Sequence, residues 1–141
     1  MIRFNDHVSA ACLPRHDLTT NGDSLCEISS WSVIEEDQIR LEGRLKGSDV
    51  PIIQDPCLGT NDKDRSWICA GTKQNPIECY LDKGTPLVCN IGPRHSIVGI
   101  LTKASSCLED TPLTGPASVG VTNSFIRISQ YSDWIRTRLD L

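Results

Sequence analysis

Hydrophobic and polar positions alternate over short stretches along most of the chain, and turn-forming residues separate these stretches. Pairs such as Asn75-Pro76 and Gly92-Pro93 interrupt the apolar pattern repeatedly. Short alternating segments between turns favour an antiparallel β domain over a regular succession of strands and helices. The pattern therefore predicts an all-β fold, a six-stranded antiparallel barrel, with strands at residues 25–33, 39–45, 67–70, 86–91, 96–102 and 118–126.

The end of the chain changes to a helical period. Apolar residues recur there three or four positions apart, and Ser129 is a candidate N-cap for the resulting C-terminal α-helix. We expect this helix to pack against the barrel, with attachment to a membrane surface as the alternative. The residues that set the period are Ile128, Tyr131, Ile135 and Leu139.

Length and charge narrow the range of partners. A chain of 141 residues fits one domain with a real core. Its net charge of -4 is spread without a basic block, so we expect no nucleic-acid or membrane partner, and no cofactor. Apolar runs are too short to span a bilayer, and the first residues lack the core of a signal peptide. The chain is therefore cytosolic, or its beginning is missing.

The cysteines favour a chain whose beginning is missing over a cytosolic protein. Their density is typical of an oxidising compartment, which indicates a secreted protein. Neighbouring cysteines are at least ten residues apart, whereas structural zinc sites use closely paired ligands, so no metal is expected. The odd count leaves one cysteine without an internal partner, counting alone cannot choose a connectivity, and reduced core cysteines remain an alternative. The seven are Cys12, Cys26, Cys57, Cys69, Cys79, Cys89 and Cys107.

Six short sequence segments, which we call landmarks, occur along the chain in an order that is informative about its family. The segment at residues 79–89, Cys-Tyr-Leu-Asp-Lys-Gly-Thr-Pro-Leu-Val-Cys, is similar to the nucleophile loop C-x-G-D-S-G-G-P-L-V-C of trypsin-like serine proteases. The order and spacing of all six resemble the C-terminal half of that chymotrypsin-fold family. The landmarks lie at residues 8–14, 26–31, 50–53, 68–71, 79–89 and 126–135.

This resemblance has implications for coverage and for the disulfides. It implies that residues 1–141 are a partial protease domain, the second barrel and terminal helix, without the first barrel that carries the family's catalytic histidine and aspartate. It also implies the bridges Cys26–Cys89, Cys57–Cys69 and Cys79–Cys107. Cys12 is left for a partner outside this sequence, such as a light chain or propeptide.

The resemblance implies a degenerate catalytic loop. Acyl transfer in this family needs a hydroxyl nucleophile, a base and backbone donors for the oxyanion. Lys83 stands at the nucleophile position, and its ammonium has no free lone pair. Leu81 replaces the glycine on which the oxyanion hole depends, and Thr85 replaces the second glycine after the nucleophile. Asp82, which in the family pairs with a new N-terminal ammonium, could instead pair with Lys83 or another cation, or stay solvated.

The substrate cleft implied by the resemblance is altered as well. Ile77 stands at the pocket bottom, where an aspartate would select lysine or arginine. Ala104 and Asn123 match the pocket walls, which are usually glycine, and Lys103 replaces an apolar platform. His7, His16 and His95 do not match the catalytic histidine. We therefore expect no tryptic specificity.

Three functions remain open. The first is a secreted, non-catalytic protease homologue that binds or regulates a protein partner. The second is a fragment or incomplete gene model of a serine endopeptidase-like protein. The third is a silent subunit that completes a two-barrel unit with a separately encoded first barrel. In each case we expect an extracellular location and a protein partner: an upstream barrel, a light chain or a protease.

Overall fold

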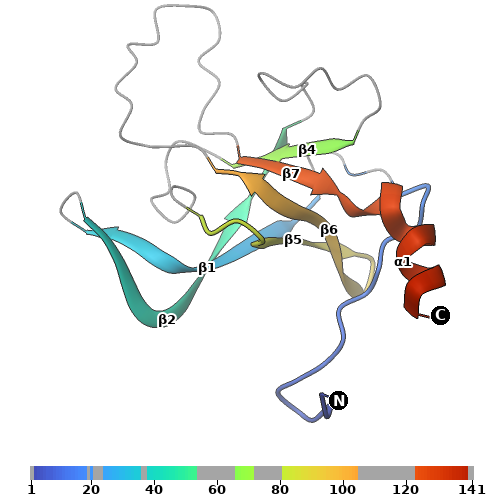
Figure 1. Cartoon of the computed structure of the whole chain (residues 1–141), viewed down its shortest axis with the longest axis horizontal. Coiled ribbons are helices and arrows are strands. Elements are labelled where there is room, and N and C mark those ends of the chain that lie inside the picture. The colour runs from blue at the N-terminus through green and yellow to red at the C-terminus, as the bar shows by residue number, and fades with distance from the viewer. Residues whose placement is uncertain are drawn as a thin grey trace, which may run out of the picture.

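Strands dominate the architecture of the chain. The computed structural model describes residues 2–18, 20, 24–35, 38–53, 66–71, 81–104 and 123–139, without the side chains of 32–35 and 38–44. In chain order the elements are β1 (Cys26–Glu35), β2 (Gln38–Val50), β3 (Ile52–Ile53), β4 (Trp67–Ala70), β5 (Pro86–Ile91), β6 (Arg94–Lys103), β7 (Asn123–Arg127), the 3-10 helix η2 (Ile128–Tyr131) and α1 (Ser132–Leu139). The expected all-β class with a C-terminal helix is confirmed (Figure 1).

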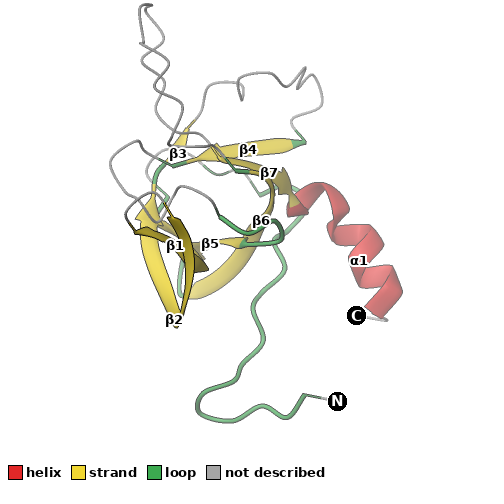
Figure 2. Ribbon diagram, turned by 60° about the vertical axis from the view of Figure 1, so that its left-hand side comes forward, coloured by secondary structure: helices red, strands yellow, loops and turns green. Residues whose placement is uncertain are grey.

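The strands form one antiparallel sheet that curls on itself. Its order is β2-β1-β5-β6-β7-β4-β3, so β2 and β3 lie at opposite ends although only Pro51 separates them along the chain. Val50 at the end of β2 pairs with Cys26, while Ile52 in β3 pairs with Ala70. The strand that runs through Pro51 thus joins both ends of the sheet and gives it a barrel-like curl (Figure 2).

The number of strands corrects the sequence prediction of six. Proline has no N–H to donate to a ladder, so the long strand is interrupted at Pro51 and continues as the short, unexpected β3. The Pro51 carbonyl still accepts a hydrogen bond from the Gly71 amide at 3.1 Å. The prediction for β4 and β5 matches the observed bounds. Residues 118–122 of the last predicted strand lie outside the described residues.

The core fills the inside of the curled sheet. Phe125, Leu87 and Cys89 have no exposed surface, and Ile28 and Leu101 are 1% exposed. Full burial of each large apolar side chain contributes about 1.5–3 kcal/mol. The core cluster consists of Cys26, Ile28, Val50, Ile52, Ile68, Ala70, Leu81, Leu87, Cys89, Val98, Leu101 and Phe125.

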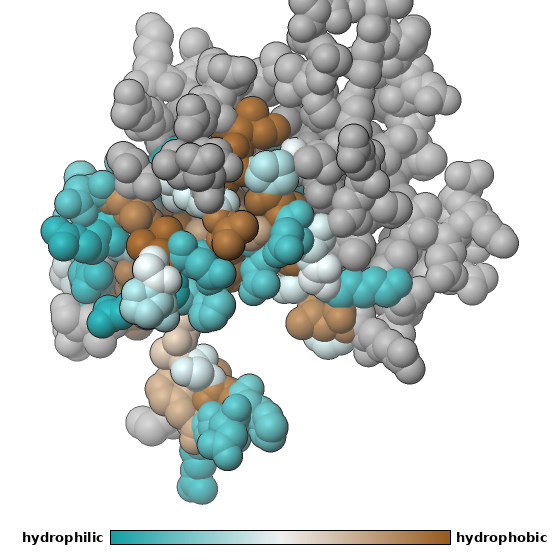
Figure 3. Space-filling model, turned by 180° about the vertical axis from the view of Figure 1, so that it is seen from behind, coloured by the Kyte–Doolittle hydropathy of each residue, from teal (hydrophilic) through white to brown (hydrophobic). Residues whose placement is uncertain are grey.

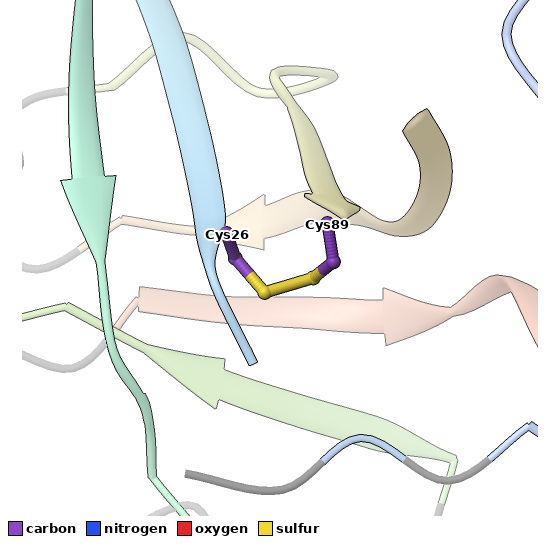
Figure 4. The surroundings of a disulfide bond; sticks show 2 residues. All are labelled: Cys26 and Cys89. Carbon is purple, nitrogen blue, oxygen red and sulfur yellow. A yellow bond between two sulfur atoms is a disulfide. The ribbon is translucent and has the colours of Figure 1, made fainter. Parts of the chain in front are cut away.

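A disulfide fixes β1 to β5. Cys26 and Cys89 are directly opposite each other in the ladder and form a bridge, as the resemblance implied (Figure 4). Both are buried, so solvent has little access to this bridge. Cys69 is also disulfide-bonded. Its expected partner Cys57, and the expected pair Cys79–Cys107, lie outside the described residues.

The N-terminal segment crosses the barrel and reaches the terminal helix. The Cys12 amide donates to the His95 carbonyl, and the Ile97 amide donates to the Cys12 carbonyl, both at 3.1 Å. The buried Ser132 hydroxyl donates to the Pro14 carbonyl at 2.8 Å. Residues 12–14 therefore connect β6 with α1.

The start of the terminal helix corrects a second prediction. Ser129 is not an N-cap: it is buried inside η2, whose N-cap is Arg127 without a side-chain cap. The chain leaves β7 directly into this 3-10 turn, and α1 begins only at Ser132. The helix lies beside the barrel, but Trp134 remains 62% exposed.

Gly99 sits at a close contact between strands, and we expect its replacement to destabilise the fold. A Cβ there would lie 2.8 Å from the Cβ of Phe125, which has no exposed surface and no room to move. Gly99→Ala should lower the free energy of unfolding by about 1–3 kcal/mol, measured by urea denaturation. Gly47→Ala is the control, because its Cβ meets only the Ile28 carbonyl at 3.8 Å. Equal stability of the two variants would contradict this account of the core.

Candidate functional site

The site expected to hold the nucleophile is a tight turn. The Thr85 amide donates to the Asp82 carbonyl at 3.0 Å, and Gly84 at the third turn position has a φ of +95°. A turn of this type requires a positive φ at that position, which glycine adopts without strain. Lys83 therefore occupies the corner of the turn, where its side chain is exposed.

Strand β6 holds this turn in place. The Gly84 amide donates to the Leu101 carbonyl at 2.9 Å, and the Leu101 amide donates to the Thr85 carbonyl at 2.9 Å. Thr85 is 6% exposed and Leu101 is 1% exposed. The backbone beneath Lys83 is thus part of the folded barrel, although the lysine side chain is in solvent.

Leu81 lies in the same loop, two residues before Lys83. Its side chain is 5% exposed and belongs to the hydrophobic core. From the sequence alone, Leu81 counts only as a lost glycine. The structure assigns its side chain a packing role that no glycine could perform.

The charged residues of the turn do not pair with each other. Asp82 and Lys83 are both exposed, and within the described part of the chain Lys83 forms no ion pair or hydrogen bond. Asp82 makes an interaction of its own. The local Asp82–Lys83 ion pair considered from the sequence is therefore absent.

The three histidines are all exposed. His95 lies on β6 six residues before Leu101, which holds the Lys83 turn. Six residues of strand span about 20 Å, so His95 lies at the far end of β6 from that turn. His7 is in the N-terminal arm, and His16 is in the turn that follows Pro14.

Three of the four expected cleft positions come together beside the turn. Lys103 is exposed at the end of β6, Ala104 is partly buried against the core, and Asn123 is fully buried at the start of β7. The pairing of Lys103 with Ser124 brings these strand ends side by side. Ile77 lies outside the described residues.

One hydrogen bond at these strand ends was not predicted from the sequence. The Thr102 hydroxyl donates to the Ser124 carbonyl at 3.0 Å, which ties the end of β6 to β7 across a register shift. No sequence signal indicates this bond, because it depends on the pairing of strands distant in the chain. Among the described residues no group of histidine, cysteine and acidic side chains is suited to hold a metal ion.

Substitution of Leu81 should destabilise the fold far more than substitution of Lys83. Leu81→Gly removes a buried side chain and adds backbone freedom, so it should lower the free energy of unfolding by about 3–5 kcal/mol. Lys83→Ser changes an exposed side chain and should alter it by less than about 0.5 kcal/mol. Urea denaturation measures both. A loss below about 1 kcal/mol for Leu81→Gly would show that the loop is not part of the core.

Comparison with known proteins agrees with this geometry. The trypsin family model matches residues 1–135. Human transmembrane protease serine 5 is 26% identical over 140 residues, which cover 95% of this chain and 29% of the relative. The chain thus spans less than a third of the length of that protease. A curled antiparallel sheet, a terminal helix and a family match over nearly the whole chain lead to one conclusion: the chain belongs to the trypsin family.

Proposed function

We propose that this chain is a non-catalytic trypsin-family homologue that acts outside the cell as a binding or regulatory module for a protein partner. The observation that carries the proposal is Lys83, exposed at the corner of the turn that matches the family's nucleophile loop. An exposed lysine presents a hydrated positive charge instead of a hydroxyl nucleophile. The family's acyl transfer cannot begin at this residue.

The surroundings of Lys83 support the same proposal. An oxyanion hole depends on backbone amides held in a conformation that glycine permits. Leu81 occupies the glycine position, and its side chain is buried in the core. The packing of Leu81 therefore fixes the loop, and its backbone lacks the conformational freedom that a glycine would give at this position.

The cleft positions are poorly suited to a basic substrate side chain. Lys103 adds a positive charge to the strand that would lie along the substrate. Ile77, which the resemblance matches to the pocket bottom, has no carboxylate. Ala104 and Asn123 fill space that glycine would leave open. Like charges disfavour each other, so a lysine or arginine substrate is the least suitable occupant.

Exposed apolar surface supports the binding role. The N-terminal arm, residues 2–11, is exposed throughout and projects from the body (Figure 3). Its Asn5–Val8 backbone hydrogen bonds shape a turn, with Ile2 78% and Phe4 68% exposed beside it. On α1, Trp134 is 62% exposed, with the Arg138 guanidinium carbon 5.7 Å from its ring centroid. Clusters of exposed apolar residues usually mark interaction sites.

Cys12 offers a covalent attachment point for such a partner. It is the free cysteine of the described residues and is partly exposed. Two backbone hydrogen bonds to β6 hold it in place, so its thiol is presented at a fixed position. We assign it an intermolecular disulfide with a chain outside this sequence, such as a light chain, an upstream barrel or a protease.

The extracellular location rests on disulfide chemistry. The Cys26–Cys89 bridge is stable in oxidising compartments, and the human relative carries the name of a transmembrane protease. No helix of the described residues is long and apolar enough to cross a membrane.

A second candidate is a piece of a larger serine endopeptidase-like protein. The observation that favours it is coverage, because the chain corresponds to 29% of the length of the human relative. A silent subunit paired with a separately encoded first barrel is the third candidate. Sequencing of the transcript upstream of Met1 separates them, since an in-frame first barrel supports the second candidate alone.

We expect no peptide hydrolysis by this chain. Chromogenic peptide amides and esters should show no turnover above buffer, and serine-directed phosphonates should not label it, because Lys83 replaces the nucleophile. Lys83→Ser should also stay inactive, because a serine without a positioned base loses most of its nucleophilicity. Intact trypsin assayed in parallel is the control. Turnover that co-purifies with the chain and disappears in Lys83→Ala would overturn the proposal.

We expect Cys12 to be the reactive thiol of the native protein. Iodoacetamide under non-denaturing conditions should label Cys12 but not the bridged Cys26, Cys69 and Cys89, and oxidised samples should contain Cys12-linked dimers. Cys12→Ser should leave the free energy of unfolding nearly unchanged, whereas loss of Cys26–Cys89 should lower it by about 4 kcal/mol. Unreduced peptide maps check the linkage. A bond between Cys12 and another cysteine of the chain would remove the basis for an external partner.

A further inference from the structure

The pair formed by β1 and β2 has two different faces. Along β1, residues 26, 28 and 30 are buried, and along β2, residues 48 and 50 are buried. The alternate residues face outward, because successive side chains of a strand point to opposite sides. We call these alternate residues the outer face: Leu25, Glu27, Ser29, Trp31, Leu45, Gly47 and Asp49.

One end of the outer face is apolar. Trp31 is 50% exposed and Leu45 is 55% exposed. Both lie at the register shift after the Ser30–Lys46 pair. The solvent side of an antiparallel sheet is ordinarily polar, so the exposed tryptophan and leucine need an explanation beyond the fold.

The other end of the outer face carries two acids, beside Leu25, which is 72% exposed. Glu27 and Asp49 are directly opposite each other in the ladder, and both are exposed. Within the described part of the chain, neither carboxylate has an ion pair or hydrogen bond. Like charges directly opposite destabilise a sheet. A cation between these two carboxylates would relieve the repulsion.

The middle of the outer face is open. Ser29 pairs with Gly47 between the acidic and the apolar ends; the serine side chain is small and the glycine has none. From Glu27 to Trp31 is four residues, or about 13 Å along an extended strand. A second extended segment laid along β1 covers the same length with four residues.

We propose that the outer face binds an extended protein segment that carries a lysine or arginine four residues away from an apolar side chain. The cation lies between Glu27 and Asp49, the residue midway crosses Ser29 and Gly47, and the apolar side chain packs against Trp31 and Leu45. The inference deepens the protein-binding role proposed above and rests on it, because it specifies the chemistry of a partner.

Charge decides between this occupant and the others. In a symmetric contact between two copies through the outer face, four carboxylates would share one interface without a cation from that face, which is unfavourable. An anionic membrane surface is repelled for the same reason. An extended segment with one cation and one apolar side chain complements both the carboxylates and the apolar end of the outer face.

The test is a titration of the 15N-labelled 141-residue chain with an end-capped heptapeptide, Ser-Lys-Ser-Val-Ser-Leu-Ser, followed by NMR. Amide shifts should concentrate in residues 25–31 and 45–49. A peptide with glutamate in place of lysine should cause none of them. The Glu27→Gln/Asp49→Asn variant should bind the lysine peptide about five-fold more weakly, from two exposed ion pairs.

The matched control is Asp6→Asn/Asp133→Asn, which changes the net charge by the same amount on the arm and on α1. It should bind as the unchanged chain does. The Glu27→Gln/Asp49→Asn variant should melt no lower than the unchanged chain, because it removes a repulsion. Equal binding of the glutamate peptide, equal affinity of the two double variants, or shifts confined to other residues would each overturn the proposal.

The same samples separate this inference from the proposed function. Mass spectrometry after the titration shows whether the peptide is intact. Cleavage after its lysine would contradict the non-catalytic role and leave the binding result standing. An intact peptide that causes no shifts in the outer face would contradict only the docking proposal.

Discussion

The fold depends on one strand that serves both ends of the sheet. Val50 closes the ladder with β1, and two residues later Ile52 begins the ladder with β4. Pro51 lies between them and cannot donate to a ladder, so the strand can change partners there. Without this connection the sheet would be open, and the side chains inside it, from Ile28 to Phe125, would lose their enclosure.

The same enclosure holds the turn at Lys83 in place. Gly84 and Thr85 are hydrogen-bonded to Leu101, and Leu81 is buried beneath them. The loop therefore keeps its position through packing and backbone bonds that do not involve the side chain of Lys83. The barrel therefore does not depend on which side chain stands at this corner, which is why fold alone does not establish activity.

The two faces of β1 show how one strand can serve stability and binding together. Its inward residues carry the disulfide and part of the core. Its outward residues include an acid opposite an acid and an exposed tryptophan, neither of which improves the stability of the isolated sheet. The two sets alternate along the chain, so substitutions on the outer face leave the core residues unchanged.

The sequence by itself determined the all-β class, the bounds of β4 and β5, the terminal helix and the place of Lys83, because alternation, turn residues and a motif are local signals. The Cys26–Cys89 bridge followed from resemblance rather than from counting. Only the tertiary structure decided that a proline divides one strand into two, that Ser129 is buried instead of capping a helix, and that Leu81 belongs to the core. It also placed Glu27 against Asp49 and Trp31 near Leu45. These features depend on which distant strands pair and in which register, and a side chain's surroundings are set by that pairing rather than by its neighbours in sequence.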